Sequence, residues 1–194
     1  MITARDLHRS FGAKHVLRGL DFDVVERDVL VLTGPNGSGK STLLALIAGL
    51  LAPTKGTLEV RAERREIGYL AHEPLVYREL TALENLELYG RLYRIPERRE
   101  RIGMLLERFG LWNVRHERVS AFSRGMAQRL AFCRVLLHEP GLVLLDEPYS
   151  GLDEEGAGLV YEELQCLAGK KTLVIATHDP DRLGPLTTAG LALA

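Results

Sequence analysis

Residues 34–42 place three glycines, a lysine and hydroxyl side chains between two apolar stretches. The first stretch, residues 29–33, has the length and composition of a buried strand, and the second, residues 43–51, is typical of a helix. The Gly-x4-Gly-Lys-Ser spacing is that of a phosphate loop, in which glycines let the backbone wrap around phosphate oxygens at a helix N-terminus. The segment therefore predicts a strand, a loop and a helix that bind a nucleoside triphosphate.

The chemistry of this loop assigns a task to its two key side chains. Lys40 is expected to reach the terminal phosphates, and the Ser41 hydroxyl is expected to ligate Mg²⁺. The alternative, a glycine-rich turn with an idle lysine, does not explain why the loop joins a strand to a helix. The predicted nucleotide-binding residues of the loop are Gly34, Pro35, Asn36, Gly37, Ser38, Gly39, Lys40, Ser41 and Thr42.

The whole chain sets limits on this interpretation. Its 194 residues, of which 46% are hydrophobic, suit one α/β domain with an inserted subdomain. The formal net charge of -1 provides no overall attraction to nucleic acid, so no nucleic-acid partner is expected. Two distant cysteines support neither a disulfide framework nor a zinc site. No apolar stretch is long enough to span a bilayer, so we expect a cytosolic chain that reaches a membrane only through a partner.

Hydrophobic patterns divide the chain into strands and one helical region. Residues 16–33 have strand character, and within them residues 20–24 alternate apolar and acidic side chains, which is typical of an antiparallel sheet with one exposed face. Residues 142–145 and 173–176 are short apolar runs, as expected for central parallel strands covered by helices. Between residues 74 and 137 the apolar residues fall at helical spacing, which predicts an inserted helical subdomain.

Two adjacent carboxylates, Asp146 and Glu147, follow the apolar run 142–145. Ligands of α/β folds bind at the C-terminal ends of such strands, and neighbouring strand residues point to opposite faces. Asp146 can therefore face the Mg²⁺ beside Ser41, while Glu147 is free to orient or deprotonate an attacking water. This division of labour predicts phosphoryl transfer to water.

At this point the chain resembles the ATP-binding subunits of ATP-binding cassette (ABC) transporters over nearly its whole length. Further motifs, in the order expected of that family, carry the resemblance: a signature segment around Ser123, a D-loop after the acidic pair, a switch histidine at His178, and Phe11 at the place of an adenine-stacking aromatic. The signature positions are Ser123, Arg124, Gly125 and Met126, and the D-loop positions are Ser150, Gly151, Leu152 and Asp153.

The resemblance implies a fold and a set of partners. The expected fold is an α/β phosphate-loop NTPase core with a mainly parallel sheet, an N-terminal antiparallel β subdomain and the helical insert, all within one domain, 1–194. Two such domains sandwich two ATP molecules in this family, so Ser123 and Gly125 would contact the γ-phosphate held by a second ATP-binding subunit. Ser123 is also a good N-cap for a helix that begins near Arg124. A multispanning membrane permease would hold the dimer at the cytoplasmic face of the cell membrane.

Two departures from the common family pattern bear on the subtype. Arg124 and Met126 replace a glycine and a glutamine of the signature, a form similar to exporter branches, and the role of Arg124 stays open. His72 stands where most members have a glutamine that senses Mg²⁺ and water; because imidazole is a poor ligand for Mg²⁺, we expect His72 to act through water or a hydrogen bond. His72 and the segment 80–86 resemble the ATP-binding subunit of haem exporters for cytochrome c biogenesis.

Two other classes share the phosphate loop. Soluble cassette ATPases of DNA repair or ribosomes generally carry a long coiled-coil insert or two cassettes, and this sequence has neither. A small-molecule kinase leaves residues 123–129 and 150–153 unexplained. For the membrane partner, the apolar residues Leu75, Val76 and Tyr77 beside an expected flexible loop are a candidate binding site, although packing inside the helical insert is an equal alternative.

Overall fold

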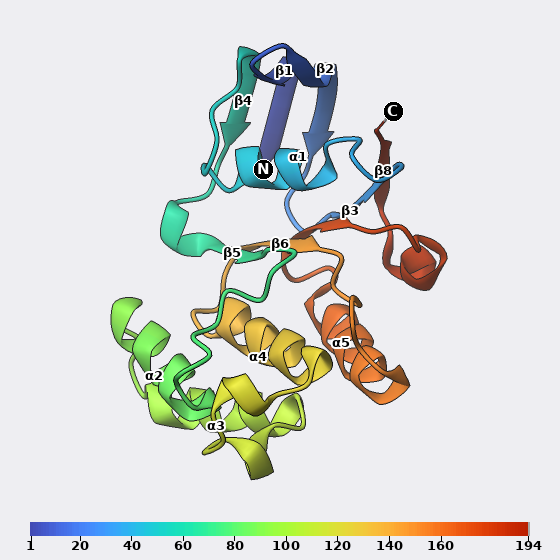
Figure 1. The fold of residues 1–194 in the computed structure, drawn as a ribbon. Helices are drawn as coiled ribbons and strands as arrows, with labels where there is room; N and C mark the ends of the chain where they lie inside the picture. Colours follow the sequence, from blue (N-terminus) through green and yellow to red (C-terminus); the bar gives the residue numbers. More distant parts are fainter. Residues whose placement is uncertain (194) are drawn as a thin grey trace.

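The computed structural model describes residues 1–193, which form two sheets and a group of helices arranged in layers (Figure 1). The small sheet lies at one end, with helix α1 between it and the larger sheet, and helices α2 to α5 cover the opposite face of the larger sheet. The fold class predicted from the sequence is confirmed by these two sheets and their helices.

The small sheet is antiparallel and has the strand order β2-β1-β4. Phe22 and Val24 turn toward the core while Asp21 and Asp23 stay exposed, so the alternation seen in the sequence does mark a half-exposed sheet. Its strands are β1 (Ile2–Phe11), β2 (Lys14–Val24) and β4 (Lys55–Val60).

The large sheet has five strands in the order β5-β6-β7-β3-β8, and every neighbouring pair is parallel. Alternate residues of β6 enter different cores: Val143 and Leu145 pack with the helices α2 to α5, and Leu142 and Leu144 pack with α1 and the small sheet. Burial on both faces explains why these strands are uniformly apolar. The strands are β3 (Val29–Thr33), β5 (Ile67–Leu70), β6 (Leu142–Asp146), β7 (Thr172–Ala176) and β8 (Ala189–Ala192).

Three helices, α2 to α4, separate β5 from β6 in the chain, within the region whose apolar spacing predicts helices. Thr81 and Glu84 form a reciprocal capping box that fixes the start of α2. No helix among residues 1–193 has the length and apolar character needed to cross a membrane. The helices are α1 (Lys40–Ile47), α2 (Ala82–Leu92), α3 (Arg98–Arg108), α4 (Arg124–Leu136) and α5 (Glu154–Leu167), with 3-10 turns at Arg64–Glu66, Trp112–Val114, Val119–Ala121 and Asp181–Leu186.

Candidate nucleotide-binding site

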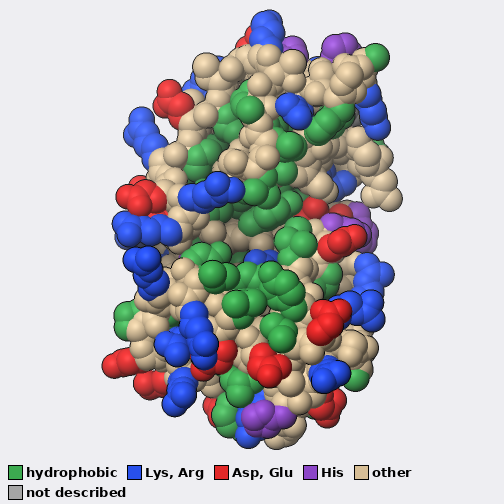
Figure 2. Space-filling model, turned by 60° about the vertical axis from the view of Figure 1, so that its left-hand side comes forward, with side chains coloured by type: hydrophobic (Ala, Val, Ile, Leu, Met, Phe, Trp, Pro, Cys, Tyr) green, Lys and Arg blue, Asp and Glu red, His purple; other side chains and the backbone are tan. Residues whose placement is uncertain are grey.

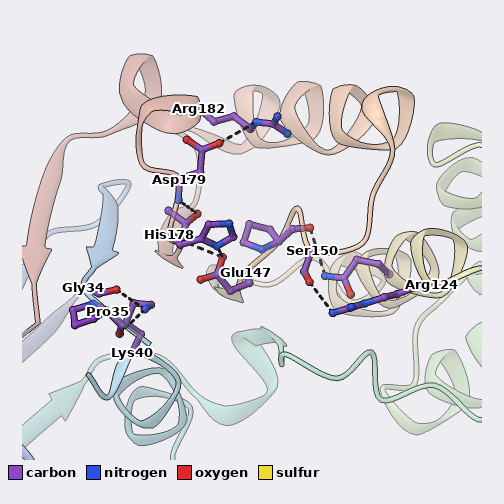
Figure 3. A network of polar contacts seen from close by, with 12 residues as sticks. Gly34, Pro35, Lys40, Arg124, Glu147, Ser150, His178, Asp179 and Arg182 are labelled. Atoms are coloured by element: carbon purple, nitrogen blue, oxygen red, sulfur yellow. Dashed lines mark hydrogen bonds and ion pairs between the residues drawn. The ribbon is translucent and has the colours of Figure 1, made fainter. Parts of the chain in front are cut away.

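The phosphate loop joins the end of β3 to the start of α1, as the sequence predicts. Gly34 has a φ of +139° and passes so close to the chain that a β-carbon there would lie 2.3 Å from the Leu193 carbonyl oxygen. Gly39, with a φ of +101°, precedes α1 and provides no side-chain cap, so the first amides of the helix are left for an anion. The Lys40 ammonium donates to the carbonyls of Gly34, at 2.8 Å, and Pro35, at 3.2 Å, and thus lies folded over the loop (Figure 3).

Asp146 ends β6 beside this loop, and its side chain is buried, with only 3% of the residue exposed. Burial raises the pKa of Asp146, and the nearby Ser41 hydroxyl opposes that shift. Its Oδ2 atom is buried and has no hydrogen-bond partner among the described residues. Mg²⁺ prefers oxygen ligands and usually binds one or two carboxylates together with substrate phosphates. The buried carboxylate oxygen and the Ser41 hydroxyl therefore fit the ion expected from the sequence.

The Glu147 side chain points toward His178, which follows β7 (Figure 3). The His178 Nδ1 atom and the Glu147 Oε2 atom are 2.7 Å apart, and the Glu147 side chain is only 15% exposed. Glu147 has a φ of +50°, a left-handed conformation that is uncommon for a residue with a side chain, and its amide donates to the Ala176 carbonyl at 2.9 Å. The backbone therefore leaves the strand at Glu147, and its carboxylate reaches the His178 ring that follows β7.

The phosphate loop, Asp146 and Glu147 line a cleft of about 610 Å³ together with Phe11 and His72. Phe11 is 46% exposed, and the Arg9 guanidinium lies 4.4 Å from its ring centre. This cleft therefore contains the aromatic ring expected to stack on the base, the phosphate loop and both carboxylates. The volume is within the range of small-molecule sites.

Two further lining residues, Lys14 and Val16, are missed by the sequence reasoning. They belong to β2, whose first residue Lys14 pairs with Phe11 across a tight turn that contains Gly12, with a φ of +58°. The signal was present in the sequence, because a glycine turn after Phe11 predicts a hairpin and alternate residues of its second strand share one face.

The signature segment does not join this cleft in the described chain. Ser123 caps α4 as predicted, accepting a hydrogen bond from the Met126 amide at 3.1 Å, and both Ser123 and Arg124 are exposed. None of residues 123–126 is among the cleft-lining residues of the described chain. An exposed helix start remote from the phosphate loop agrees with the expectation that it acts on an ATP molecule held by a second subunit.

The D-loop packs against this helix start. Asp153 caps α5 by accepting from the Gly156 amide at 2.8 Å. Arg124, whose role the sequence leaves open, donates from Nη2 to the Ser150 hydroxyl at 2.9 Å (Figure 3). Arg124 therefore makes its hydrogen bond to a residue of its own chain.

The apolar cluster 75–77 has two exposed members and one packed member. Leu75 is 53% exposed and Tyr77 is 51% exposed, whereas Val76 packs against the core that contains the helices. Two α2 side chains hold the backbone of this cluster: Asn85 bonds both the amide and the carbonyl of Tyr77, and the Tyr89 hydroxyl donates to the Leu75 carbonyl. The exposed side chains of Leu75 and Tyr77 therefore extend from a backbone that hydrogen bonds hold in place.

Apolar side chains gather on the face of the molecule that carries α2. Figure 2 shows that face with hydrophobic side chains along its middle and charged side chains around them. A hollow of about 500 Å³ in this chain is lined by Leu75, Val76, Phe122 and residues at the start of α4. The candidate partner surface is therefore next to the signature segment.

A phosphate loop between a parallel strand and a helix, with an acidic residue at the end of a neighbouring strand, defines the class of P-loop nucleotide-binding proteins. Within that class, residues 17–150 match the family model described as ABC transporter. The chain belongs to the ABC transporter family, in agreement with the resemblance carried by its motifs.

Relatives and solved structures of the same family are similar to the whole chain. An uncharacterized ABC transporter ATP-binding protein, YxlF of Bacillus subtilis (strain 168), is 39% identical over 184 residues, which cover 92% of this chain and 62% of the relative. The Nod factor export ATP-binding protein I of Rhizobium meliloti (strain 1021) is 36% identical over 189 residues, 91% of this chain and 56% of the relative. The chain thus spans about three fifths of the length of these curated relatives.

Two solved structures of the cassette MJ0796 also match. A dimeric form, titled a bacterial ABC transporter cassette, has a TM-score of 0.89 at 27% identity and covers 100% of this chain and 94% of its own. A dimeric post-hydrolysis state bound to ADP and Pi has a TM-score of 0.88 at 27% identity, with the same coverage. The ATPase class expected from the sequence agrees with these comparisons. None of these three proteins is named for haem or cytochrome c, so the narrower subtype stays a proposal.

Proposed function

We propose that this chain is the ATP-hydrolysing subunit of an ABC exporter and that residues 1–194 form one ATP-binding domain, with the helical insert at about 74–137. The observation that carries the proposal is the placement of Asp146 and Glu147 at the end of β6, one beside Ser41 and the other against His178. This arrangement separates metal binding from water activation, as hydrolysis of a phosphoanhydride requires. ATP and Mg²⁺ are the proposed cofactors.

The chain's own groups then have distinct tasks. Phe11 stacks on the base, the loop amides and Lys40 hold the phosphates, and Ser41 and Asp146 hold Mg²⁺. Ser41 and Asp146 would hold the ion, and when bound it would supply positive charge that offsets the charge developing on the phosphates. Glu147 accepts a proton from the attacking water.

His178 is the proposed partner of Glu147 in this step, because its ring nitrogen is already 2.7 Å from the carboxylate. Its side chain is 73% exposed and can therefore approach a bound γ-phosphate. His72 lines the same cleft and is exposed, which supports contact through a water molecule rather than direct metal ligation.

The proposal requires two copies of the chain. Residues 123–126 lie outside the cleft, and the similar cassette MJ0796 is a dimer. Ser123 and the Gly125 amide would complete the site of the second copy, with the D-loop residues 150–153 at the shared interface. A multispanning permease at the cytoplasmic face of the membrane is the proposed second partner, and it would contact the chain through Leu75 and Tyr77.

Export is favoured over import by the form of the signature, and relatives named for Nod factor export and daunorubicin resistance add support. The haem exporter subtype rests on His72 and the segment 80–86 alone. A soluble cassette ATPase of DNA repair or ribosomes is the second candidate. Affinity capture from detergent-solubilised native membranes separates the two classes, since only the transporter subunit retains a multispanning protein; capture of none would favour the soluble class.

The hydrolytic assignment is tested by Glu147→Gln. The amide keeps the shape of the side chain but accepts no proton, so we expect ATP turnover to fall by about 10²–10⁴-fold while ATP still binds. Dimers trapped with ATP should accumulate on size exclusion. Glu59→Gln is the matched control, because Glu59 is exposed on β4 of the small sheet and should leave turnover unchanged. Hydrolysis by Glu147→Gln at close to the wild-type rate would show that Glu147 is not the base.

A further inference from the structure

The hydrogen bond between Arg124 and Ser150 joins two segments that the proposed function assigns to different ATP molecules. Arg124 belongs to the signature segment, which would contact ATP bound by the second subunit. Ser150 follows Glu147 by three residues, and Glu147 serves the ATP bound by this chain. The Nη2 atom and the Ser150 hydroxyl are 2.9 Å apart. A single side chain therefore connects the two sites.

Close backbone packing surrounds this hydrogen bond. A β-carbon on Gly151 would lie 2.7–2.9 Å from the Cδ, Cγ and Nε atoms of Arg124, so the arginine side chain lies across Gly151. A β-carbon on Gly125 would lie 2.9 Å from the Gly151 carbonyl oxygen. The start of α4 and the D-loop are thus in direct contact, and the absence of side chains at both glycines permits that contact.

The D-loop is in turn connected to the catalytic carboxylate. The Ser150 amide donates to the Glu147 carbonyl at 2.9 Å, which closes a turn over residues 147–150. Glu147 has a left-handed backbone, which is strained for a residue with a side chain and persists only where neighbouring structure supports it. Gln128 of α4, a buried residue, is directed at the Pro148 carbonyl of the same turn at 3.5 Å. The helix α4 therefore contacts the turn through two side chains.

We propose that Arg124 is a positioning residue. Its hydrogen bond to Ser150 fixes the turn 147–150 against the signature segment, and this turn fixes the position of the Glu147 carboxylate. This inference rests on the proposed function. In this role Arg124 acts within its own chain, and its charge does not contact the phosphate of the ATP bound by the second subunit. Movement of α4 on contact with the second subunit's ATP would reach Glu147 through Ser150.

The test is a double-mutant cycle with Arg124→Met and Ser150→Ala in the purified chain, measured as kcat and KM for ATP with Mg²⁺. Each single change should lower kcat by about tenfold, because misplacing a catalytic group by about 1 Å can cost up to a hundredfold. KM should stay within about twofold. The double variant should be no slower than the slower single variant, because both changes remove one interaction.

Two further variants separate positioning from general damage. Ser150→Thr keeps the hydroxyl acceptor and should retain kcat within about twofold of wild type, which a loss of packing alone would not predict. Arg61→Met is the charge control, since the exposed Arg61 side chain has no hydrogen bond or ion pair among residues 1–193. ATP-dependent dimerisation is measured for Arg124→Met in a Glu147→Gln background and should be unchanged.

Other outcomes would overturn the inference. If Arg124→Met raises KM or abolishes the ATP-dependent dimer while Ser150→Ala does neither, the arginine binds phosphate in the partner's site. Losses of kcat that multiply in the double variant would show that the two side chains act separately. Unchanged kcat with a lowered thermal midpoint would assign the hydrogen bond to stability alone. A wild-type chain without Mg²⁺-dependent ATPase activity would instead refute the proposed function, and the inference with it.

Discussion

In the apolar cluster 75–77, a glutamate placed at Leu75 and one placed at the neighbouring Val76 should have different effects on the stability of the fold. Leu75 is 53% exposed, and its carbonyl, rather than its side chain, accepts the hydrogen bond from the Tyr89 hydroxyl. Leu75→Glu therefore leaves that bond in place and should change the free energy of unfolding by no more than about 0.5 kcal/mol. Val76 packs against the helical core, so Val76→Glu loses apolar burial and places a carboxylate in an apolar setting, at a cost of about 2 kcal/mol or more.

These free energies convert to measurable shifts. For a chain of 194 residues, 1 kcal/mol corresponds to a change of about 2–4 °C in the thermal midpoint. Val76→Glu should therefore lower the midpoint by about 4–8 °C or more, and Leu75→Glu by less than about 2 °C. If a permease docks on this cluster, Leu75→Glu should also reduce capture of the membrane protein by about tenfold, since losing one apolar anchor costs about 1–2 kcal/mol of binding.

The assay combines thermal unfolding, nucleotide affinity and co-purification from detergent-solubilised membranes. Leu50→Glu is the matched control, because Leu50 is also 53% exposed but lies just beyond α1. It should retain both the midpoint and the capture of the partner. Undiminished capture by Leu75→Glu would refute the docking surface. A midpoint lowered as far as that of Val76→Glu would show that Leu75 contributes to the core.

Three further predictions concern other sites of the chain. Asn85 is fully buried and its side chain forms three hydrogen bonds, so Asn85→Ala should lower the free energy of unfolding by about 3 kcal/mol in urea denaturation; a loss below about 1 kcal/mol would contradict its role in fixing Tyr77. Burial lowers the pKa of His138, although its hydrogen bond to the Ile67 carbonyl opposes the shift. Because the folded chain then binds the proton more weakly than the unfolded chain, stability should fall as pH drops through about 6.5, and thermal midpoints of His138→Gln between pH 7.5 and 5.5 should fall less than those of wild type. At the cleft, His72→Gln should change the rate of ATP turnover because His72 lines the same cavity as Glu147, and an unchanged rate would exclude contact with the attacking water.

The sequence predicts the parts of the fold that depend on local chemistry. The phosphate loop, the Ser123 cap and the buried strand before Asp146 each follow from residue type and spacing, and the structure places them as expected. Strand alternation predicts that Asp146 and Glu147 point to opposite faces, but β6 ends at Asp146 and both side chains line one cleft. The left-handed backbone of Glu147, however, comes from contacts with Ala176 and the following turn, which no local pattern records.

The elements that are missed depend on distant partners. The strand β1 carries charged residues, and its pairing with β2 shifts register between Ala4 and Leu7, where Asp6 has a φ of +46°, so its alternation is broken. The strand β8 is short, and three of its four residues are alanine or glycine, which have little strand preference; it exists because it pairs with β3. The Arg124 contact is equally hidden, since a long flexible side chain finds its acceptor only after the D-loop has folded.

The strand order of the large sheet has a consequence for biosynthesis. The strand β3, which leads into the phosphate loop, is paired on one side with β7 and on the other with β8. Both partners are made after residue 171, so β3 leaves the ribosome long before either edge can be hydrogen-bonded. At about 5–20 residues per second, the roughly 140 residues between β3 and β7 take at least several seconds to synthesise. During that time the nascent chain exposes an apolar strand with two open edges, which is a target for chaperones and for aggregation, and it gains the capacity to hold ATP only near the end of translation.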